Sequence, residues 1–215
     1  MKTGRLFVIS GPSGAGKGTI CRSLLSGVGG GESGGTELSV SATTRSPRPG
    51  EKDGVSYHFV SDEEFRRMID YDDFLEYAEV FGGFYGTPKH AVMGKLEEGR
   101  DVLLEIDVQG ALQVKRNYPE SILVFILPPT IGELQRRIEG RGSESAEQIE
   151  KRVSEATREI GAISAYDYYV VNEDIEKTVA ELNEILSGRH PRMAPEEALE
   201  IIKRFNAGTV GTTIR

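Results

Sequence analysis

The sequence predicts an α/β fold built on a parallel, doubly wound sheet. Short apolar runs of strand length alternate along the chain with segments in which apolar residues recur at helical spacing. A glycine-rich turn directly follows the first apolar run, at the point where a strand would pass into a helix. The chain has 215 residues, which is enough for one such domain together with inserted segments.

Four apolar runs are predicted to be buried strands of this sheet. They are residues 6–10, 102–106, 122–127 and 168–172. Gly11-Pro12 closes the first run, and residues 38–41 form a further candidate strand. Because helical patterns separate the runs, we expect parallel strands that are joined by crossover helices.

Helices are predicted after each of these strands. After the glycine-rich turn, Ile20, Leu24 and Leu25 recur at helical spacing. Ser61 and Glu64 form a capping-box pattern, and Phe65, Met68 and Ile69 supply the apolar face of the helix that follows. The other helices are expected at about 108–115, from 131 to 138, at 146–160, around 179–186 and at 196–205.

The stretch between the first strand and Val102 is too long for one crossover helix, so a separate segment is inserted there. Residues 26–36 are glycine-dense, and we expect them to be a mobile connector that lets the following subdomain rotate when ligands bind. Beyond Gly188 the chain adds a helix with Leu199, Ile202 and Phe205 on its apolar face. That helix can dock on the core or mediate self-association, and the end of the tail is expected to be disordered.

Composition excludes several classes of protein. The chain carries 34 acidic against 26 basic residues and a net charge of −8, which argues against a nucleic-acid coat or a polybasic membrane binder. Cys21 is the single cysteine, so an internal disulfide is impossible and a reducing compartment is favoured. No apolar run approaches the ~20 residues of a membrane-spanning helix, and no signal-peptide pattern is present. We therefore expect a cytoplasmic protein.

Residues 11–17 match a phosphate-binding loop, in which two glycines separated by four residues precede a lysine. Glycine lets backbone amides turn toward phosphate oxygens, and the following helix adds its positive N-terminus. Lys17 can reach the β- and γ-phosphates. The sequence thus predicts a P-loop type of sheet that binds a nucleoside triphosphate. The candidate ATP-binding residues here are Gly11, Pro12, Ser13, Gly14, Ala15, Gly16, Lys17, Gly18 and Thr19.

The position after the lysine, normally a Ser or Thr that binds Mg²⁺, is Gly18, and the hydroxyl stands one residue later at Thr19. We expect Mg²⁺ to bind together with ATP and to be held mainly by phosphates and water, with Thr19 as a candidate ligand. A GTPase would need an Asn-Lys-x-Asp element, which the sequence lacks. An AAA-type machine would need a much larger chain.

Several further motifs narrow the class. Residues 39–51 read Ser-Val-Ser-Ala-Thr-Thr-Arg-Ser-Pro-Arg-Pro-Gly-Glu, and Gly54-Val55-Ser56-Tyr57-His58-Phe59 follow. The others are Phe74-Leu75-Glu76-Tyr77-Ala78, Phe84-Tyr85-Gly86-Thr87, Glu105-Ile106-Asp107-Val108-Gln109-Gly110, Glu139-Gly140-Arg141-Gly142 and Val171-Asn172. With these motifs in order, the chain from about Arg5 to Leu186 resembles guanylate kinases.

The resemblance implies transfer of the terminal phosphoryl group of ATP to GMP, giving ADP and GDP, in the recycling of GMP and dGMP. It also implies a P-loop core, an inserted GMP-binding subdomain and a short lid. The expected division is core at 1–37, 96–136 and 153–190, GMP-binding subdomain at 38–95, lid at 137–152 and C-terminal extension at 191–215. ATP and GMP are then the partners, and the chain is expected to be a monomer or a small homo-oligomer.

The expected GMP site combines charge with hydrogen-bond acceptors. Arg45 and Arg48, in a proline-flanked loop, can present forked donors to one phosphate, although a solvated face is the alternative. Guanine offers N1–H and N2–H donors, so its site needs acceptors. The resemblance implies that Glu76 accepts from both. By the same resemblance Ser41 and Thr87 read the base edge, and Tyr57 and Tyr85 bind the phosphate; taken alone, either tyrosine would be a core residue.

Glu105 and Asp107 stand at the carboxyl end of a predicted central strand, where doubly wound sheets bind ligands. The resemblance implies that both approach GMP and the magnesium region, with Asp107 a candidate ligand through water; a structural salt bridge is the alternative. It also implies that Arg137, Arg141 and Arg152 contact phosphates from the lid, and that Asn172 lies near the adenine, on the side of the phosphate loop. The expected catalytic residues are Lys17, Arg45, Arg137, Arg141 and Arg152, whereas Arg136 and Arg158 are expected to be surface charges.

Two other functions compete with this interpretation. A kinase of the same build could act on another phosphorylated acceptor, such as a ribose bisphosphate, but it would have no use for Glu76 and Ser41 as guanine readers. A non-catalytic scaffold module that resembles guanylate kinases would typically have lost Lys17 and the lid arginines, which are present here.

Overall fold

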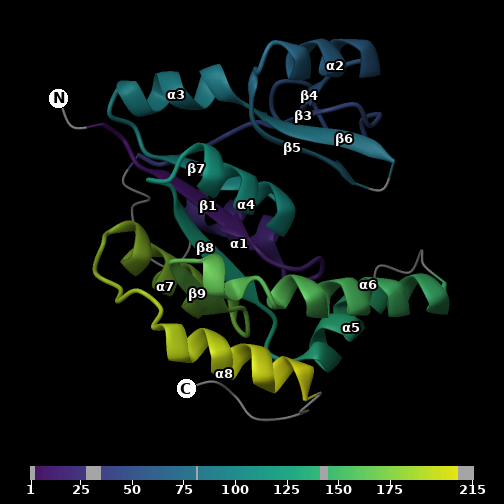
Figure 1. Cartoon of the computed structure of the whole chain (residues 1–215), viewed down its shortest axis with the longest axis vertical. Helices are drawn as coiled ribbons and strands as arrows, with labels where there is room; N and C mark the ends of the chain where they lie inside the picture. The colour runs from purple at the N-terminus through teal and green to yellow at the C-terminus, as the bar shows by residue number, and fades with distance from the viewer. Residues whose placement is uncertain (1–2, 28–34, 81, 141–144, 208–215) are drawn as a thin grey trace. The chain divides into compact units, whose positions relative to one another are not determined.

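The computed structural model describes residues 3–27, 35–80, 82–140 and 145–207 (Figure 1). The chain forms two compact units. The first unit comprises Met1–Phe7 and Gly35–Ser121, and the second unit comprises Val8–Gly34 and Ile122–Arg215. Most of the predicted connector at 26–36 and the end of the tail lie outside the described residues.

The strands of the larger sheet are β1 (Leu6–Ser10), β2 (Glu37–Leu38), β7 (Val102–Glu105), β8 (Ile122–Leu127) and β9 (Tyr168–Val171). Their order is β2-β7-β1-β8-β9, and β2 pairs parallel to β7 as β8 does to β9. β1 begins in the first unit and ends in the second. Strands that are neighbours in this sheet but not in sequence require crossovers, so the predicted α/β class is confirmed.

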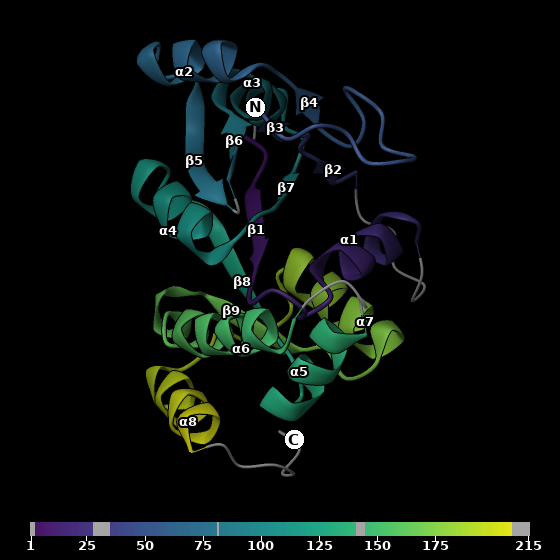
Figure 2. The ribbon, with the colours of Figure 1, turned by 90° about the vertical axis from the view of Figure 1, so that its right-hand side faces the viewer.

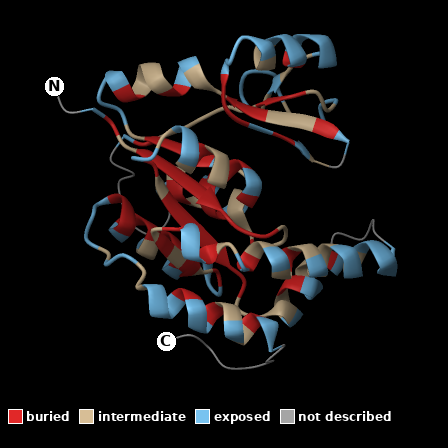
Figure 3. Cartoon of the chain, viewed as in Figure 1, coloured by how far each residue is buried: buried red, intermediate tan, exposed pale blue. Residues whose placement is uncertain are grey.

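Burial explains why these runs are strands. All five residues of β1 and all but the first of β8 are buried, as Figure 3 shows in red. Parallel strands covered on both faces are apolar at every position rather than at alternate ones. This is the pattern by which the sequence predicts them.

The helices of the second unit follow the predicted periodicity. They are α1 (Lys17–Leu25), α5 (Ile131–Glu139), α6 (Ala146–Ile160), η1 (Ile163–Ala165), α7 (Ile175–Leu186) and α8 (Pro195–Asn206). A capping box between Ser145 and Gln148 begins α6, so the predicted bounds 146–160 are confirmed. α1 packs against α7 (Figure 2), and Cys21 is buried on α1 as expected.

The tail helix α8 docks on its own unit, against η1 and α6. Its buried residues are Ala198, Ile201 and Phe205. The predicted apolar face was wrong for Leu199, whose side chain is 56% exposed. The helix instead buries Ala198 and Ile201 together with Phe205, so the buried stripe begins one position earlier than predicted.

The first unit contains a second sheet, with strand order β4-β3-β6-β5. Its strands are β3 (Ala42–Thr43), β4 (His58–Phe59), β5 (Phe74–Val80) and β6 (Gly83–Pro88), and its helices are α2 (Asp62–Asp70), α3 (Lys89–Glu97) and α4 (Val108–Asn117). β6 pairs antiparallel to both β3 and β5. Ser61 caps α2 by accepting from the Glu64 N–H at 3.1 Å, as predicted. The sequence predicts that a separate segment is inserted here, but it does not predict the strands of this sheet.

The single strand predicted at residues 38–41 was wrong. Glu37–Leu38 pairs with β7 in the larger sheet, whereas Ala42–Thr43 pairs with β4 and β6 in the second sheet. Residues 39–41 belong to neither strand. The chain leaves one sheet and enters the other here. Two short strands therefore take the place of the single predicted strand.

Phe65 is expected to be the main anchor of α2 on the second sheet. Its fully buried ring stacks on Phe74 of β5 and Phe84 of β6, with ring centroids 4.5 and 5.5 Å apart. We predict that Phe65→Ala lowers the free energy of unfolding by about 3–5 kcal/mol, because it leaves a cavity. Urea denaturation measures this loss.

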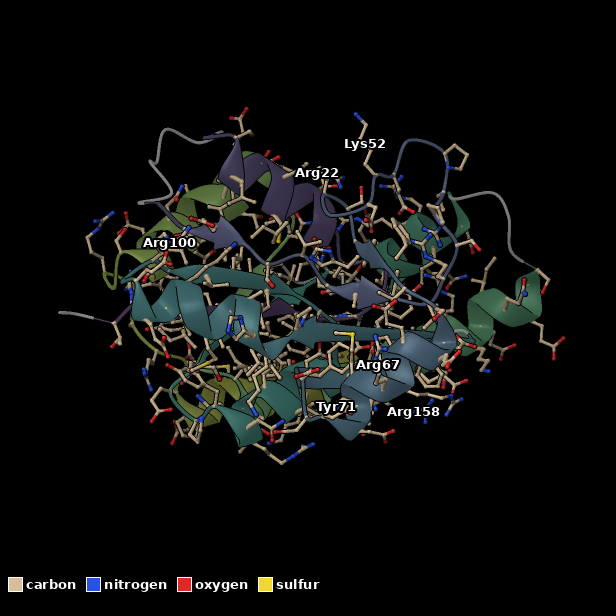
Figure 4. All side chains as sticks on the ribbon, turned by 90° about the horizontal axis from the view of Figure 1, so that it is seen from above. Arg22, Lys52, Arg67, Tyr71, Arg100 and Arg158 are labelled. Atoms are coloured by element: carbon tan, nitrogen blue, oxygen red, sulfur yellow. The ribbon has the colours of Figure 1, made fainter. Side chains whose placement is uncertain are left out.

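The control is Tyr71→Ala, which removes a ring that lies on the surface with 73% of its area exposed (Figure 4). This change should alter the stability by less than about 0.5 kcal/mol. A similar small effect of Phe65→Ala would contradict the packing described here.

No helix among the described residues has both the length and the apolar character needed to cross a membrane.

Candidate functional site

At three positions, the loop between β1 and α1 has a backbone conformation that favours glycine. Gly11, Gly14 and Gly16 have φ values of 142°, 92° and 94°, which side chains disfavour. A Cβ at Gly11 would lie 2.3 Å from the Ile126 carbonyl oxygen, and one at Gly16 would lie 2.4 Å from Asn172 Nδ2. The loop is therefore held closely against the rest of the second unit.

Lys17 begins α1 and folds its side chain back over this loop. Its Nζ donates to the carbonyl oxygens of Gly11, at 2.5 Å, and Pro12, at 3.1 Å. Lys17 is half-buried, so its ammonium places a positive charge at the glycine loop, which suits the binding of phosphate.

Three of the other predicted residues converge on the same loop. Arg152 Nη2 donates to Ser13 Oγ. Asn172 is buried, and its Nδ2 donates to the Ala15 carbonyl at 2.7 Å. Arg137 Nη2 donates to the Asn172 carbonyl at 3.0 Å. Arg141 lies outside the described residues.

Glu133 orients Arg137, although no role was predicted for Glu133 from the sequence. Its Oε1 accepts from Arg137 Nε at 2.7 Å. Arg136 and then Arg137 hold the pKa of the Glu133 carboxyl down at about 2, against some cost of burial. The four-residue spacing of Glu133 and Arg137 on a helix is the signal that predicts such a pair. Arg136 and Arg158 are exposed, as expected; Arg158 is labelled in Figure 4.

The candidate metal ligands, Thr19 and Asp107, do not belong to a cluster of metal-binding side chains among the described residues. Thr19 is exposed, and its Oγ1 accepts from Arg22 Nη2 at 3.4 Å. Within the described ranges, no three His, Cys, Asp or Glu residues gather as metal ligands would.

In the first unit, Glu76 and Thr87 form a buried polar pair. They face each other across β5 and β6, and Glu76 is 5% and Thr87 0% exposed. Thr87 Oγ1 donates to Glu76 Oε1 at 2.7 Å. The pKa of the Glu76 carboxyl is raised to about 7, chiefly because the group is buried; the Thr87 hydrogen bonds lower this pKa, and the charge of Asp107 raises it. A carboxyl poised near neutrality in an apolar setting is typical of a functional site.

Asp107 and Glu105 lie at the end of β7, as predicted. Asp107 is the N-cap of α4, since its Oδ1 accepts from the Gly110 N–H at 2.7 Å. Asp107 thus has a structural role in addition to any contact with ligand. Glu105 is exposed.

Arg45 is the centre of a second cluster in the first unit. Its Nε donates to the Tyr85 hydroxyl at 3.2 Å, and its guanidinium lies 5.4 Å from the centroid of the Tyr57 ring. Burial, and then the charge of Glu105, raises the pKa of Tyr57. Arg48 is exposed and Ser41 is half-buried immediately before β3. The structure therefore brings Arg45, Tyr57 and Tyr85 together as predicted.

Glu51 completes this cluster and was given no role in the sequence analysis. Its two carboxylate oxygens accept from both terminal nitrogens of Arg45 at 2.9 Å. Oε2 also accepts from the Arg48 N–H at 2.7 Å. Arg45, and then the Arg48 backbone, lowers the pKa of Glu51 to about 2. The sequence signal is weak, because Arg45 and Glu51 are six residues apart in a loop, where spacing does not predict contact.

Each unit therefore carries its own set of ligand-binding groups. The second unit has a glycine loop with a lysine, suited to phosphates. The first unit has a buried carboxylate and hydroxyl, suited to a base with adjacent N–H donors, and an arginine–tyrosine cluster, suited to a phosphate.

Comparison with known proteins finds similar proteins along most of the chain. A family model described as guanylate kinase matches residues 3–189. A guanylate kinase of Clostridioides difficile is 50% identical over 205 residues, which cover 95% of this chain and 97% of that protein. One of Caldanaerobacter subterraneus is 52% identical over 185 residues, covering 86% and 87%. The crystal structure of guanylate kinase from Anaplasma phagocytophilum matches with a TM-score of 0.71 and 35% identity, covering 93% and 95%.

Proposed function

The chain belongs to the guanylate kinase family and is an ATP:GMP phosphotransferase; on this premise we propose that the first unit binds GMP and the second unit binds ATP. The observation that carries the proposal is the buried pair of Glu76 and Thr87, because a carboxylate between strands suits the adjacent N1–H and N2–H donors of guanine.

The GMP site divides into a part for the base and a part for the phosphate. Glu76 accepts from guanine N1–H and N2–H, while Ser41 and Thr87 contact the base edge. Arg45, Arg48, Tyr57 and Tyr85 bind the phosphate, and Glu105 and Asp107 approach GMP from the end of β7. Glu51 supports this assignment, because it holds the Arg45 guanidinium in a fixed plane through two hydrogen bonds.

The ATP site is the loop at 11–19, with Asn172 near the adenine. The transferred phosphoryl group spreads negative charge over three oxygens, so its transfer depends on positioning and on cations. In this proposal Lys17, Arg45, Arg137, Arg141 and Arg152 supply them. The GMP phosphate oxygen is already an anionic nucleophile, so the reaction proceeds by in-line transfer without a covalent enzyme intermediate or a strong base.

Guanylate kinases generally use ATP together with Mg²⁺, which neutralises phosphate charge. We propose that phosphates and water supply most of its ligands here, because Mg²⁺ usually keeps several waters. The residues fit this role. One oxygen of Asp107 accepts from Gly110, which leaves the other to accept from a metal-bound water, and Thr19 offers a hydroxyl from the start of α1.

We also propose how the chain divides into domains, where the enzyme acts and how it assembles. Residues 38–95 form the GMP-binding subdomain and 137–152 the lid, with core at 1–37, 96–136 and 153–190 and the extension at 191–215. The enzyme acts in the cytoplasm as a monomer or small homo-oligomer.

The affinity for GMP is expected to fall in acid. Guanine needs Glu76 as an acceptor, and the pKa of this carboxyl is raised to about 7. Below that pH the carboxyl is protonated in the free enzyme. The KM for GMP should therefore rise from pH 8 to pH 6, and the size of this rise should approach about tenfold for each pH unit. Steady-state rates at saturating ATP measure this rise, and the KM for ATP should change little.

Guanosine provides the control, because it lacks the phosphate that itself titrates near pH 6. Its inhibition constant should rise over the same pH range. If the constants for guanosine and for GMP were both flat between pH 8 and 6, Glu76 would not be the guanine reader.

A further inference from the structure

We propose that one face of α4, formed by Gly110, Gln113 and Asn117, positions the Glu76 carboxylate for guanine. The proposal rests on the proposed role of Glu76 and assigns these three as positioning residues. Their spacing of three and then four residues puts them on the same side of the helix. α4 packs along β5, the strand that carries Glu76.

The amide side chains of α4 bond the backbone of β5 on both sides of Glu76. β5 is an edge strand of its sheet, so one row of its backbone groups needs partners from outside the sheet. Gln113 Nε2 donates to the Tyr77 carbonyl at 2.8 Å, and its Oε1 accepts from the Tyr77 N–H at 3.3 Å. Asn117 Nδ2 donates to the Leu75 carbonyl at 2.7 Å.

These bonds flank a position where the strand is irregular. The register of β5 against β6 shifts between Phe74 and Glu76, and such a shift re-aims the side chains that follow it. Because Gln113 and Asn117 fix the backbone at residues 75 and 77, they fix the direction in which Glu76 leaves the strand.

Gly110 leaves room for the carboxylate itself. A Cβ at this position would lie 2.5 Å from Glu76 Oε2, closer than any real contact. The other oxygen, Oε1, accepts from Thr87. The carboxylate therefore lies between Thr87 and the start of α4, and a methyl group at Gly110 would push it out of place.

Gly110→Ala separates positioning from stability. Gly110 lies within α4 and is not among the glycines with a positive φ, so alanine should favour the helix and maintain or raise the melting temperature. The displaced carboxylate should raise the KM for GMP roughly tenfold, the effect of weakening a hydrogen bond to a charged group. The kcat at saturating GMP and the KM for ATP should change little.

A selectivity measurement adds a readout that a merely structural change would not move. Inosine monophosphate keeps N1–H but lacks the 2-amino donor, so a displaced Glu76 should lower the preference for GMP over inosine monophosphate. Gln113→Ala should act in the same direction by severalfold. Gln109→Ala is the matched control, since it removes an exposed glutamine from the same helix.

Steady-state kinetics test the proposal by measuring the KM for GMP in Gly110→Ala, Gln113→Ala and Gln109→Ala, and in Gly110→Ala combined with Glu76→Ala. The expected result is a rise for the first two alone and no further effect of Gly110→Ala once Glu76 is absent. If Glu76→Ala raises the KM but Gly110→Ala and Gln113→Ala behave like Gln109→Ala, the positioning proposal is wrong. If Glu76→Ala itself leaves the KM unchanged, the proposed role of Glu76 fails instead.

Discussion

Lys17→Ala is expected to lower kcat roughly 10³-fold, the loss typical of removing one fixed donor from a transition state that gains charge. Lys17 Nζ lies at the carbonyls of Gly11 and Pro12, within the loop. A cation there can exchange these carbonyls for phosphate oxygens without rearrangement of the backbone. A coupled assay of ADP release at saturating ATP and GMP measures the loss.

The matched control is Lys203→Ala, which removes an exposed lysine from α8 in the same unit. It should leave kcat within about twofold, because isolated surface charges contribute little. A decrease of less than tenfold in Lys17→Ala, with the protein folded, would show that Lys17 is not central to transfer.

Glu76→Ala is expected to lower kcat/KM for GMP by roughly 10³-fold, mostly through KM. Two guanine donors would lose a charged acceptor, each worth about 1.5–3 kcal/mol. Thr87 would also lose the partner of its hydroxyl, which is fully buried. Steady-state kinetics with varied GMP at saturating ATP measure both constants.

Two further variants separate charge from packing. Glu76→Gln keeps the shape of the side chain but brings an NH₂ donor against the guanine donors, so its loss should be of similar size. Glu79→Ala, an exposed acid on the same strand, should have little effect. A KM for GMP within about threefold of the unchanged protein in Glu76→Ala would contradict the assignment.

Sequence periodicity predicted those elements in which a single local pattern continues along the whole length. β8 and α6 have the predicted bounds, because a continuous apolar run and a long helical repeat each have one interpretation. The second sheet was not predicted strand by strand. β3 and β4 have two residues each, and β6 contains Gly83, Gly86 and Pro88, which disfavour strands. These strands depend on pairing between distant segments, and no local pattern records it.

The site shows the same division between local and long-range information. The residues that the motifs single out form two clusters in the structure. One contains Arg45, Tyr57 and Tyr85, and the other contains Glu76 and Thr87. They did not predict Glu51 or Glu133, the carboxylates that orient Arg45 and Arg137. An acid that pairs with an arginine resembles any other surface acid until the fold brings the two together.

The most direct test is the ADP-release assay with ATP and Mg²⁺, in which GMP, dGMP, AMP, CMP, UMP and ribose 1,5-bisphosphate are offered in parallel. We expect kcat/KM for GMP to exceed that for AMP, CMP and UMP by at least about 10³-fold, because buried acceptors reject bases without matching donors. Faster turnover of ribose 1,5-bisphosphate or of another base would contradict the guanine site. A folded protein that binds ATP but turns over none of these acceptors would contradict the catalytic account as a whole.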